Sequence, residues 1–394
     1  MSNPTSAYIH LPFCRRRCYY CDFAISVVGD NPLTSDSLMV KDYVEHLCQE
    51  IELGRTEQEP LKTVFFGGGT PSLLPVEDLA KILKTLDLCL EIAPEAEISI
   101  EIDPGTFDYP QLQEYLNLGI NRFSLGVQSF EPELLAVCGR THDLQDIFTA
   151  VELIDRANIK NYSLDLMTGL PQQTIEHCQN SLQQAIAISP AHLSCYDLVL
   201  EPVTAFGKQY QPGATPLPTE ETTAQMYRLT QQLLSSAGYQ HYEISNYARS
   251  GYQCQHNRVY WLNQAYYGFG MSAASYTKGI RFSRPRTRKT YYEWVKQGAK
   301  LETDGVKQPT TSRNDRLLET LMLGLRLTEG ISLIAIAEEH GETTLKQLLR
   351  CLEPFQKQDL VSLHHEQIQL NDPEGLLVSN TILATLFEKL AVDE

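Results

Sequence analysis

Short apolar and β-branched runs alternate with amphipathic stretches from the start of the chain to about residue 246. The runs predict strands at Ala7–His10, Thr63–Phe66, Glu97–Ile102, Arg122–Val127, Asn161–Met167 and His192–Leu198. The amphipathic stretches predict helices near Ser37–Leu53, Val76–Leu90, Asp143–Ala157, Thr174–Ile188 and Glu220–Ala237. Strands joined by helical crossovers are parallel, so this pattern predicts an α/β fold, either an open doubly wound sheet or a barrel. We favour a partial (β/α)6 barrel of the TIM type.

The pattern changes beyond Pro285. A basic stretch, Arg281 to Lys289, and a linker-like segment at Thr303–Asn314 come first. Helical patterns then follow at Asp315–Leu327, Ser332–His340 and Thr344–Phe355, with a hairpin candidate at Val361–Leu370 and a last helix near Pro373–Leu390. We therefore expect a barrel over residues 1–246, a connecting region over residues 247–309, and a small C-terminal α+β domain of winged-helix type over residues 310–394.

Chemically distinctive residues follow five of the predicted strands. The motifs are HLPFC at 10–14, GGGTP at 67–71, EIDPG at 101–105, GVQSF at 126–130 and DLMTGLP at 165–171. In βα barrels the loops at the carboxyl ends of the strands build the active site. We therefore expect these five motifs to converge on one mouth of the barrel.

Composition narrows the class of protein. The 394 residues contain 32 Lys and Arg against 49 Asp and Glu, a net charge of −17. Such a chain is a poor partner for nucleic acid, and at most peripheral contact with a membrane is expected. The sequence contains no apolar run long enough to span a membrane and opens with no export signal, so we expect a cytoplasmic protein. Most of the ten cysteines are isolated, which argues against a disulfide framework.

Three cysteines form the exception. Cys14, Cys18 and Cys21 lie in the loop after the first predicted strand. Three thiolates can ligate three irons of a [4Fe–4S] cluster, whereas a closed cluster usually has four cysteine ligands. One iron would then stay open for a small molecule. A zinc site completed by His10 or Asp22 is the alternative, and three unliganded thiols are another.

The motifs together resemble those of a known family. They are YIHLPFCRRRCYYCDF at 8–23, FFGGGTPS at 65–72, ISIEIDP at 98–104, RFSLGVQSF at 122–130 and LDLMTGLPQQT at 164–174. The chain resembles the radical S-adenosylmethionine (SAM) superfamily, in the branch of oxygen-independent coproporphyrinogen III oxidase (HemN) and the heme chaperone HemW, and is most similar to the HemW group. The resemblance covers nearly the whole chain.

The resemblance implies cofactors and roles for single residues. The implied cofactors are a [4Fe–4S] cluster on Cys14, Cys18 and Cys21, with SAM on its open iron. The residues that match the SAM-binding positions of the branch are Tyr8, Tyr20, Gly68, Gly69, Thr70, Glu101, Gln128, Arg140, Asp165, Val199 and Ala274. Their types suit the ligand, because carboxylates accept hydrogen bonds from hydroxyl or ammonium groups and arginine pairs with carboxylates.

Two features separate the chain from the oxidase. The oxidase has a further cysteine two positions after the third cluster cysteine, where this chain has Phe23, and only seven residues precede Tyr8. The HNRVYW motif at 256–261 resembles the signature of the HemW group, which implies heme as a further cofactor. His256 can serve as an axial ligand of heme, although a structural role for it is equally open.

The resemblance therefore implies a heme chaperone. Heme would be the cargo, and hemoproteins of the respiratory type would be the acceptors. The alternative is oxygen-independent coproporphyrinogen III oxidase, a radical SAM enzyme, although the two departures argue against that activity. A zinc-stabilised binding protein is the third hypothesis.

Overall fold

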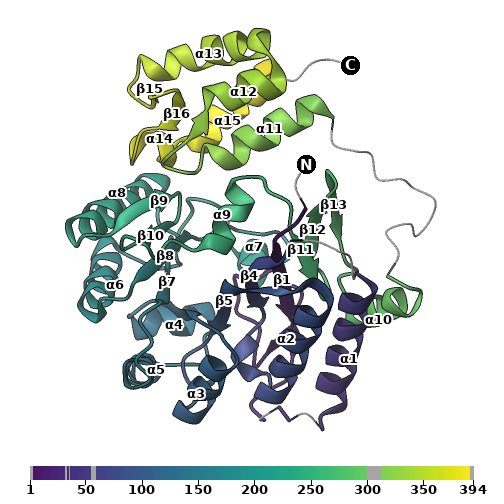
Figure 1. Cartoon of the computed structure of the whole chain (residues 1–394). Coiled ribbons are helices and arrows are strands. Elements are labelled where there is room, and N and C mark those ends of the chain that lie inside the picture. Colours follow the sequence, from purple (N-terminus) through teal and green to yellow (C-terminus); the bar gives the residue numbers. More distant parts are fainter. Residues whose placement is uncertain (1–2, 32, 35, 55–58, 300–311, 391–394) are drawn as a thin grey trace.

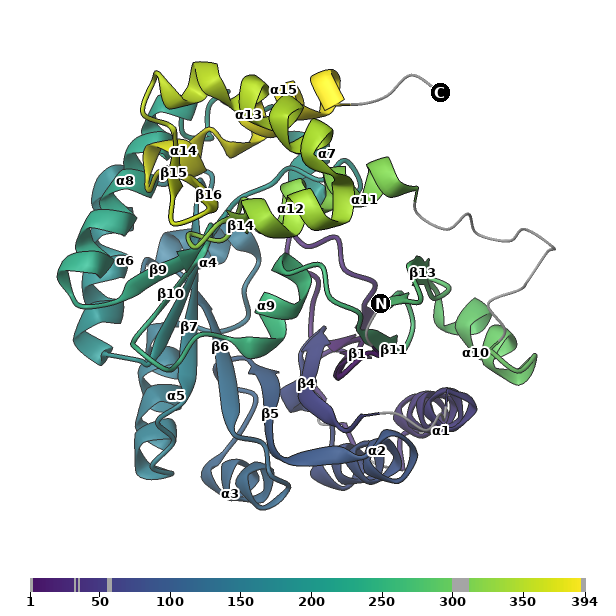
Figure 2. The same cartoon turned by 45° about the horizontal axis from the view of Figure 1, so that its top comes forward.

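The computed structural model describes residues 3–31, 33–34, 36–54, 59–299 and 312–390. Six parallel strands follow one another in the main sheet: β1 (Ser6–Leu11), β4 (Leu61–Gly68), β5 (Ile92–Ile102), β6 (Arg122–Gln128), β7 (Tyr162–Thr168) and β8 (His192–Asp197). Three short strands extend it: β11 (Tyr267–Phe269), parallel to β1, and antiparallel β10 (Asn246–Ala248) and β9 (Gln240–Glu243) beyond β8. Because β11 and β9 end the sheet without pairing with each other, the barrel is partial, as predicted (Figure 2).

Helices cover the outer face of the sheet (Figure 2). They are α1 (Leu38–Leu53), α2 (Val76–Leu90), α3 (Tyr109–Asn117), α5 (Leu144–Arg156), α6 (Ile175–Ile188) and α8 (Glu220–Ser236). The short helices α4 (Pro132–Cys138) and α7 (Ala205–Gln209) lie in the loops after β6 and β8 and bond to the backbone of Tyr19. Local sequence sets several of the starts: the Asp143 side chain accepts from the backbone N–H of Asp146 at the first turn of α5, and Thr174 does the same for His177 in α6. Each such cap supplies a partner that the first turn of a helix lacks.

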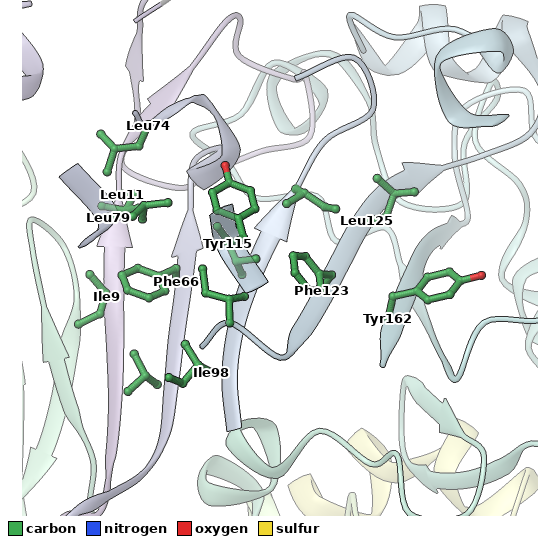
Figure 3. Packing of buried hydrophobic residues seen from close by; sticks show 14 of the residues in the cluster. Ile9, Leu11, Phe66, Leu74, Leu79, Ile98, Tyr115, Phe123, Leu125 and Tyr162 are labelled. Carbon is green, nitrogen blue, oxygen red and sulfur yellow. The ribbon is translucent and has the colours of Figure 1, made fainter. Parts of the chain in front are cut away.

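The core lies between the strands and these helices. Outward-facing Ile9, Phe66 and Phe123 pack beneath Leu79 of α2 and Tyr115 of α3 (Figure 3). All five side chains are fully buried. Burial of a large apolar side chain contributes roughly 1.5–3 kcal/mol, so this layer stabilises the barrel by several kcal/mol.

Several inward-facing positions of the middle strands are polar and small. They include Ser99 of β5, Ser124 of β6, Ser163 and Asp165 of β7, and Ser194 of β8. Bulky branched side chains fill these layers in a complete TIM barrel. Serine at these positions, in place of bulky branched residues, leaves space inside this barrel.

The C-terminal elements have a core of their own. They are α11 (Arg313–Gly324), β14 (Ile331–Ser332), α12 (Leu333–His340), α13 (Glu342–Gln356), β15 (Val361–His364), β16 (Gln367–Leu370), α14 (Glu374–Leu377) and α15 (Ser379–Leu390). The three strands form one antiparallel sheet, and the predicted helices and hairpin are confirmed. Tyr227 of α8 packs in the same apolar cluster, which joins this unit to the barrel (Figure 1).

The connecting region contributes structure to both units. It contains α9 (Gln255–Trp261), β11, the β12 (Ala274–Thr277) and β13 (Ile280–Ser283) hairpin, and α10 (Arg288–Lys296). The domain boundaries at 246 and 309 stay predictions, although β11 belongs to the barrel sheet. Of the linker-like segment, residues 303–311 lie outside the described residues.

Candidate functional site

The five motifs meet at one cavity of about 590 Å³ inside the barrel. Most of the predicted site residues line it: Tyr8, Cys14, Cys18, Tyr20, Cys21, Gly68, Gly69, Thr70, Glu101, Gln128, Arg140, Asp165 and His256. Val199 and Ala274 are not in its lining. Val199 is 65% exposed in the loop after β8, and Ala274 begins β12 in the connecting region.

The loop of the three cysteines is anchored at several points. His10 Nε2 hydrogen-bonds the carbonyl of Ala24 at 2.8 Å, and the backbone N–H of Tyr19 donates to the carbonyl of Cys138 at 3.0 Å. Cys14 lies in the short strand β2 (Phe13–Cys14), which pairs with β3 (Ser26–Val27). The backbone therefore holds the loop in place beside the cavity.

All three thiols of this loop are free and partly buried. Burial raises the pKa of the Cys14 thiol to about 12. Bound metal favours the thiolate, because a coordinating thiol is deprotonated. Among the described residues, the three sulfurs are not gathered within 4.8 Å of one another. A tetrahedral zinc ion with Zn–S bonds of about 2.3 Å would hold its sulfurs about 3.8 Å apart, so the arrangement fits a polynuclear cluster better than zinc.

The glycine motif fits closely against this loop and its neighbours. A Cβ atom on Gly69 would lie 2.6 Å from the carbonyl oxygen of Phe13, and one on Gly68, whose φ is +109°, would lie 2.4 Å from the His10 ring. On Gly67 it would lie 3.0 Å from the Glu101 carboxylate. Glycines are thus needed here for packing and backbone conformation, as well as for access to a ligand.

Buried Arg140 and partly buried Asp103 form an ion pair beside the cysteines. Asp103 also accepts from the Thr70 hydroxyl at 3.2 Å, and Arg140 Nη1 donates to Cys18 Sγ at 3.6 Å. A Cβ on Gly126 would lie 2.5 Å from the Asp103 carboxylate, so this pair requires glycine at 126. Arg140 Nε has no hydrogen-bond partner within the described structure, which leaves one buried donor for a ligand.

Two buried carboxyl groups face the interior. Glu101 accepts from the backbone N–H of Gly68 at 3.0 Å, and burial raises its pKa to about 8. Asp165 accepts from the hydroxyls of Ser124 and Ser163, and burial raises its pKa as well. Gln128 has a φ of +69° beside a register shift at the end of β6. A bulge of this kind changes the direction of a side chain at the rim of a barrel.

His256 lies in α9 with only 1% of its surface exposed. Its Nδ1 shares a 2.7 Å hydrogen bond with the Thr63 hydroxyl, and its Nε2 shares a 2.9 Å hydrogen bond with the Tyr260 hydroxyl. Burial lowers its pKa to about 3. A bond from heme iron to either nitrogen would have to replace one of these hydrogen bonds, so this geometry favours the structural role.

Comparison with known proteins identifies the family. A radical SAM superfamily model matches residues 8–185, and a HemN C-terminal domain model matches residues 311–378. Heme chaperone HemW of Synechocystis sp. is 50% identical over 410 aligned positions that cover 99% of this chain and 98% of that protein. Heme chaperone HemW of Bacillus subtilis is 34% identical and covers 98% and 100%. This chain belongs to the HemW family of radical SAM proteins.

Among solved structures, coproporphyrinogen III oxidase (HemN) from Escherichia coli, a radical SAM enzyme, has a TM-score of 0.81 to this chain at 24% identity. The match covers 98% of this chain and 90% of that one, and it shows that the HemW family member shares the fold of the oxidase. Membership of the radical SAM superfamily implies a [4Fe–4S] cluster and SAM as cofactors. The free cysteine triad and the unpaired donor of Arg140 suit these two groups.

Sequence reasoning missed several residues at or beside this cavity, and three of them make contacts that organise it. Asp103 holds Arg140, Arg122 lines the cavity, and Glu97 accepts from the backbone N–H groups of Gln255 and His256. Asp103 lies in the EIDPG motif, two positions after Glu101, and the two-residue alternation of a strand places both on one face. Nothing in the sequence linked Glu97 to α9, because 158 positions separate Glu97 from Gln255.

The basic stretch is largely structural. Arg284 pairs with Glu50 at 2.8 Å in a buried site, and Arg281 bonds Glu319 and Asn263. Arg286 donates to the backbone carbonyl of Asp22 in the cysteine loop. These arginines therefore join elements of the fold. In the described part of the chain, no helix combines the length and the apolar character needed to cross a membrane.

Proposed function

We propose that this chain is a heme chaperone that binds heme and transfers it to acceptor hemoproteins of the respiratory type. The observation that carries the proposal is the identity to proteins named heme chaperone HemW over nearly the whole chain, at 50% for Synechocystis sp. and 34% for Bacillus subtilis. The [4Fe–4S] cluster and SAM would lie within the barrel. We propose the cytoplasm as the place of transfer.

The residues divide into roles that this function requires. Cys14, Cys18 and Cys21 would hold the cluster, which supplies an open iron for SAM when it is bound. Glu101 and Arg140 would orient SAM, since one offers a buried acceptor and the other a buried donor. The Asp103 carboxylate pairs with Arg140 and would thereby fix the orientation of the guanidinium group.

The position of Phe23 supports the chaperone over the oxidase. This side chain is 56% exposed at the edge of the cavity, at the position where the oxidase has a further cysteine. An exposed aromatic side chain offers apolar contact to a flat ligand and no thiol chemistry. The activity of coproporphyrinogen III oxidase, which depends on reductive cleavage of SAM, is therefore only the second candidate function.

Heme titration of the anaerobically reconstituted protein tests the proposal. We expect stoichiometric binding, followed by absorbance, and transfer of the bound heme to an apo-hemoprotein during gel filtration. Failure of the wild type to bind heme would end the chaperone proposal. Incubation with SAM, reductant and coproporphyrinogen III tests the second candidate, for which a divinyl product would be decisive.

A further inference from the structure

The floor of the barrel interior carries hydrogen-bonding groups. Ser124, Ser194, Asp165 and Glu101 line it, and Asp165 accepts from the Ser124 hydroxyl at 2.8 Å. These groups favour hydrogen-bonding ligands, whereas a porphyrin ring needs apolar contact. A cavity of about 590 Å³ has the size that one drug-sized ligand occupies, and SAM and the cluster belong there. The cargo must therefore lie largely outside the interior.

Apolar side chains are exposed in the cysteine loop, at the end of β8 and in the loop after β8. We call five of them the rim: Tyr19, Phe23, Tyr196, Val199 and Val203, which are between 41% and 65% exposed. Phe23 and Tyr196 also line the cavity. The two loops are joined, since the backbone N–H of Phe206 donates to the carbonyl of Tyr19 at 3.0 Å. Exposed apolar groups gathered in this way mark a binding surface.

Positive charge lies next to the rim. Arg15 and Arg16 both line the cavity mouth. Arg15 has no side-chain hydrogen bond or ion pair with another described residue, and Arg16 has only an exposed pair with Asp30 at 3.2 Å. Arg17 is engaged, because its Nη1 donates to two backbone carbonyls. In a chain of net charge −17, two available guanidinium groups beside an apolar rim select a ligand that is flat, apolar and anionic at one edge.

We propose that heme docks on this rim, with its macrocycle against Phe23 and Tyr196 and its two propionates paired with Arg15 and Arg16. The proposal rests on the proposed function and adds the place and chemistry of cargo binding. Arginine pairs with carboxylate through two parallel hydrogen bonds, which fixes the orientation of the ligand. Heme then lies beside the cluster and SAM, outside the interior, and His256 is not its ligand.

Two exposed-site variants of the reconstituted full chain test the docking site. Arg15→Glu reverses one proposed propionate contact, and Phe23→Ser removes the largest apolar contact. We expect each to raise the Kd for heme about tenfold, because each removes one charged or one aromatic contact. Arg350→Glu and Leu88→Ser are the matched controls, since both side chains are exposed on helices away from the rim, and neither should change the Kd. Iron content and SAM binding are measured for all four.

Heme dimethyl ester separates the charge contact from the apolar one. The wild type should bind the ester about tenfold more weakly than heme, and Arg15→Glu should bind both with similar affinity. Wild-type affinity in both rim variants, with normal iron content, would overturn the docking site while the chaperone function stands. Equal binding of heme and ester by the wild type would overturn the propionate contacts. Absence of heme binding by the wild type would instead refute the proposed function.

Discussion

Asp103 is the residue on which the geometry of the SAM site most depends. It pairs with Arg140 and accepts a hydrogen bond from the Thr70 hydroxyl. Its carboxylate also lies so close to Gly126 that any side chain at position 126 would clash with it. Removal of one partner of a buried ion pair leaves the other charge uncompensated. Asp103 acts through Arg140, so it is a positioning residue.

We expect Asp103→Asn to weaken SAM binding at least tenfold, with the iron content unchanged, because Arg140 loses its direction while the cysteines stay in place. Calorimetric titration with SAM on the reconstituted protein measures the effect. Asp108→Asn is the control, since this carboxylate caps α3 on the outside of the barrel. A normal SAM affinity in Asp103→Asn would show that Arg140 is fixed by other contacts.

Glu101 gives the site a pH dependence. Its pKa is about 8 in the folded chain because of burial, against 4.5 as the ordinary value. Between these pH values the native carboxyl keeps a proton that the unfolded chain has lost, so this group lowers the free energy of unfolding as pH rises. Without SAM, Glu101→Gln should therefore raise the thermal midpoint more at pH 9 than at pH 5.5. Thermal unfolding of both proteins at the two pH values checks this, and an equal change at both would contradict the protonated state of Glu101.

At the scale of elements, α9 holds the interior of the barrel and the C-terminal unit together. Its first backbone N–H groups donate to Glu97 of β5, and Arg258 pairs with Glu329 at 2.7 Å. His256, Arg258 and Tyr260 of the HNRVYW motif thus make polar contacts within the protein, whereas Asn257 lines the cavity. These contacts hold the seven-residue helix α9 in place.

We expect Glu97→Gln to lower the free energy of unfolding by about 1–3 kcal/mol, since the amide offers one acceptor in place of two to the start of α9. Hydrogen exchange should rise over residues 254–261 and stay unchanged in α5. Denaturant unfolding and exchange mass spectrometry together measure this. Unchanged exchange at α9 would show that Glu97 is not what holds the helix.

The sequence predicted the regular elements of the barrel well, because each strand and helix carries its own periodicity. It missed the helices α3, α4, α7, α9 and α10 and the short strands β9 to β13. Several of these short segments are formed by contacts distant in the chain, such as the pairing of Ala7 with Tyr267. The cavity residues were predicted through their motifs at strand ends. Arg140, Val199 and Ala274 came from the resemblance alone, because none of them lies in one of these motifs.

At the scale of the whole molecule, the C-terminal unit packs against helix α8 of the barrel. Tyr227 of α8 packs in the C-terminal core, and Arg228 beside it pairs with Glu374 at 2.7 Å. The aromatic contact is buried, whereas both charged side chains are at least 40% exposed. Exposed ion pairs contribute about 0–1 kcal/mol, and a buried aromatic side chain contributes several times as much.

The neighbouring substitutions Tyr227→Ala and Arg228→Ala should therefore separate the two contributions. We expect Tyr227→Ala to cost about 3–5 kcal/mol, because it leaves a cavity at the junction, and to release the C-terminal unit as a separate unfolding transition. Arg228→Ala should cost less than about 1 kcal/mol and leave one transition. Differential scanning calorimetry of the reconstituted chain measures both. A large effect of Arg228→Ala with little effect of Tyr227→Ala would mean that charge, and not apolar packing, joins the two units.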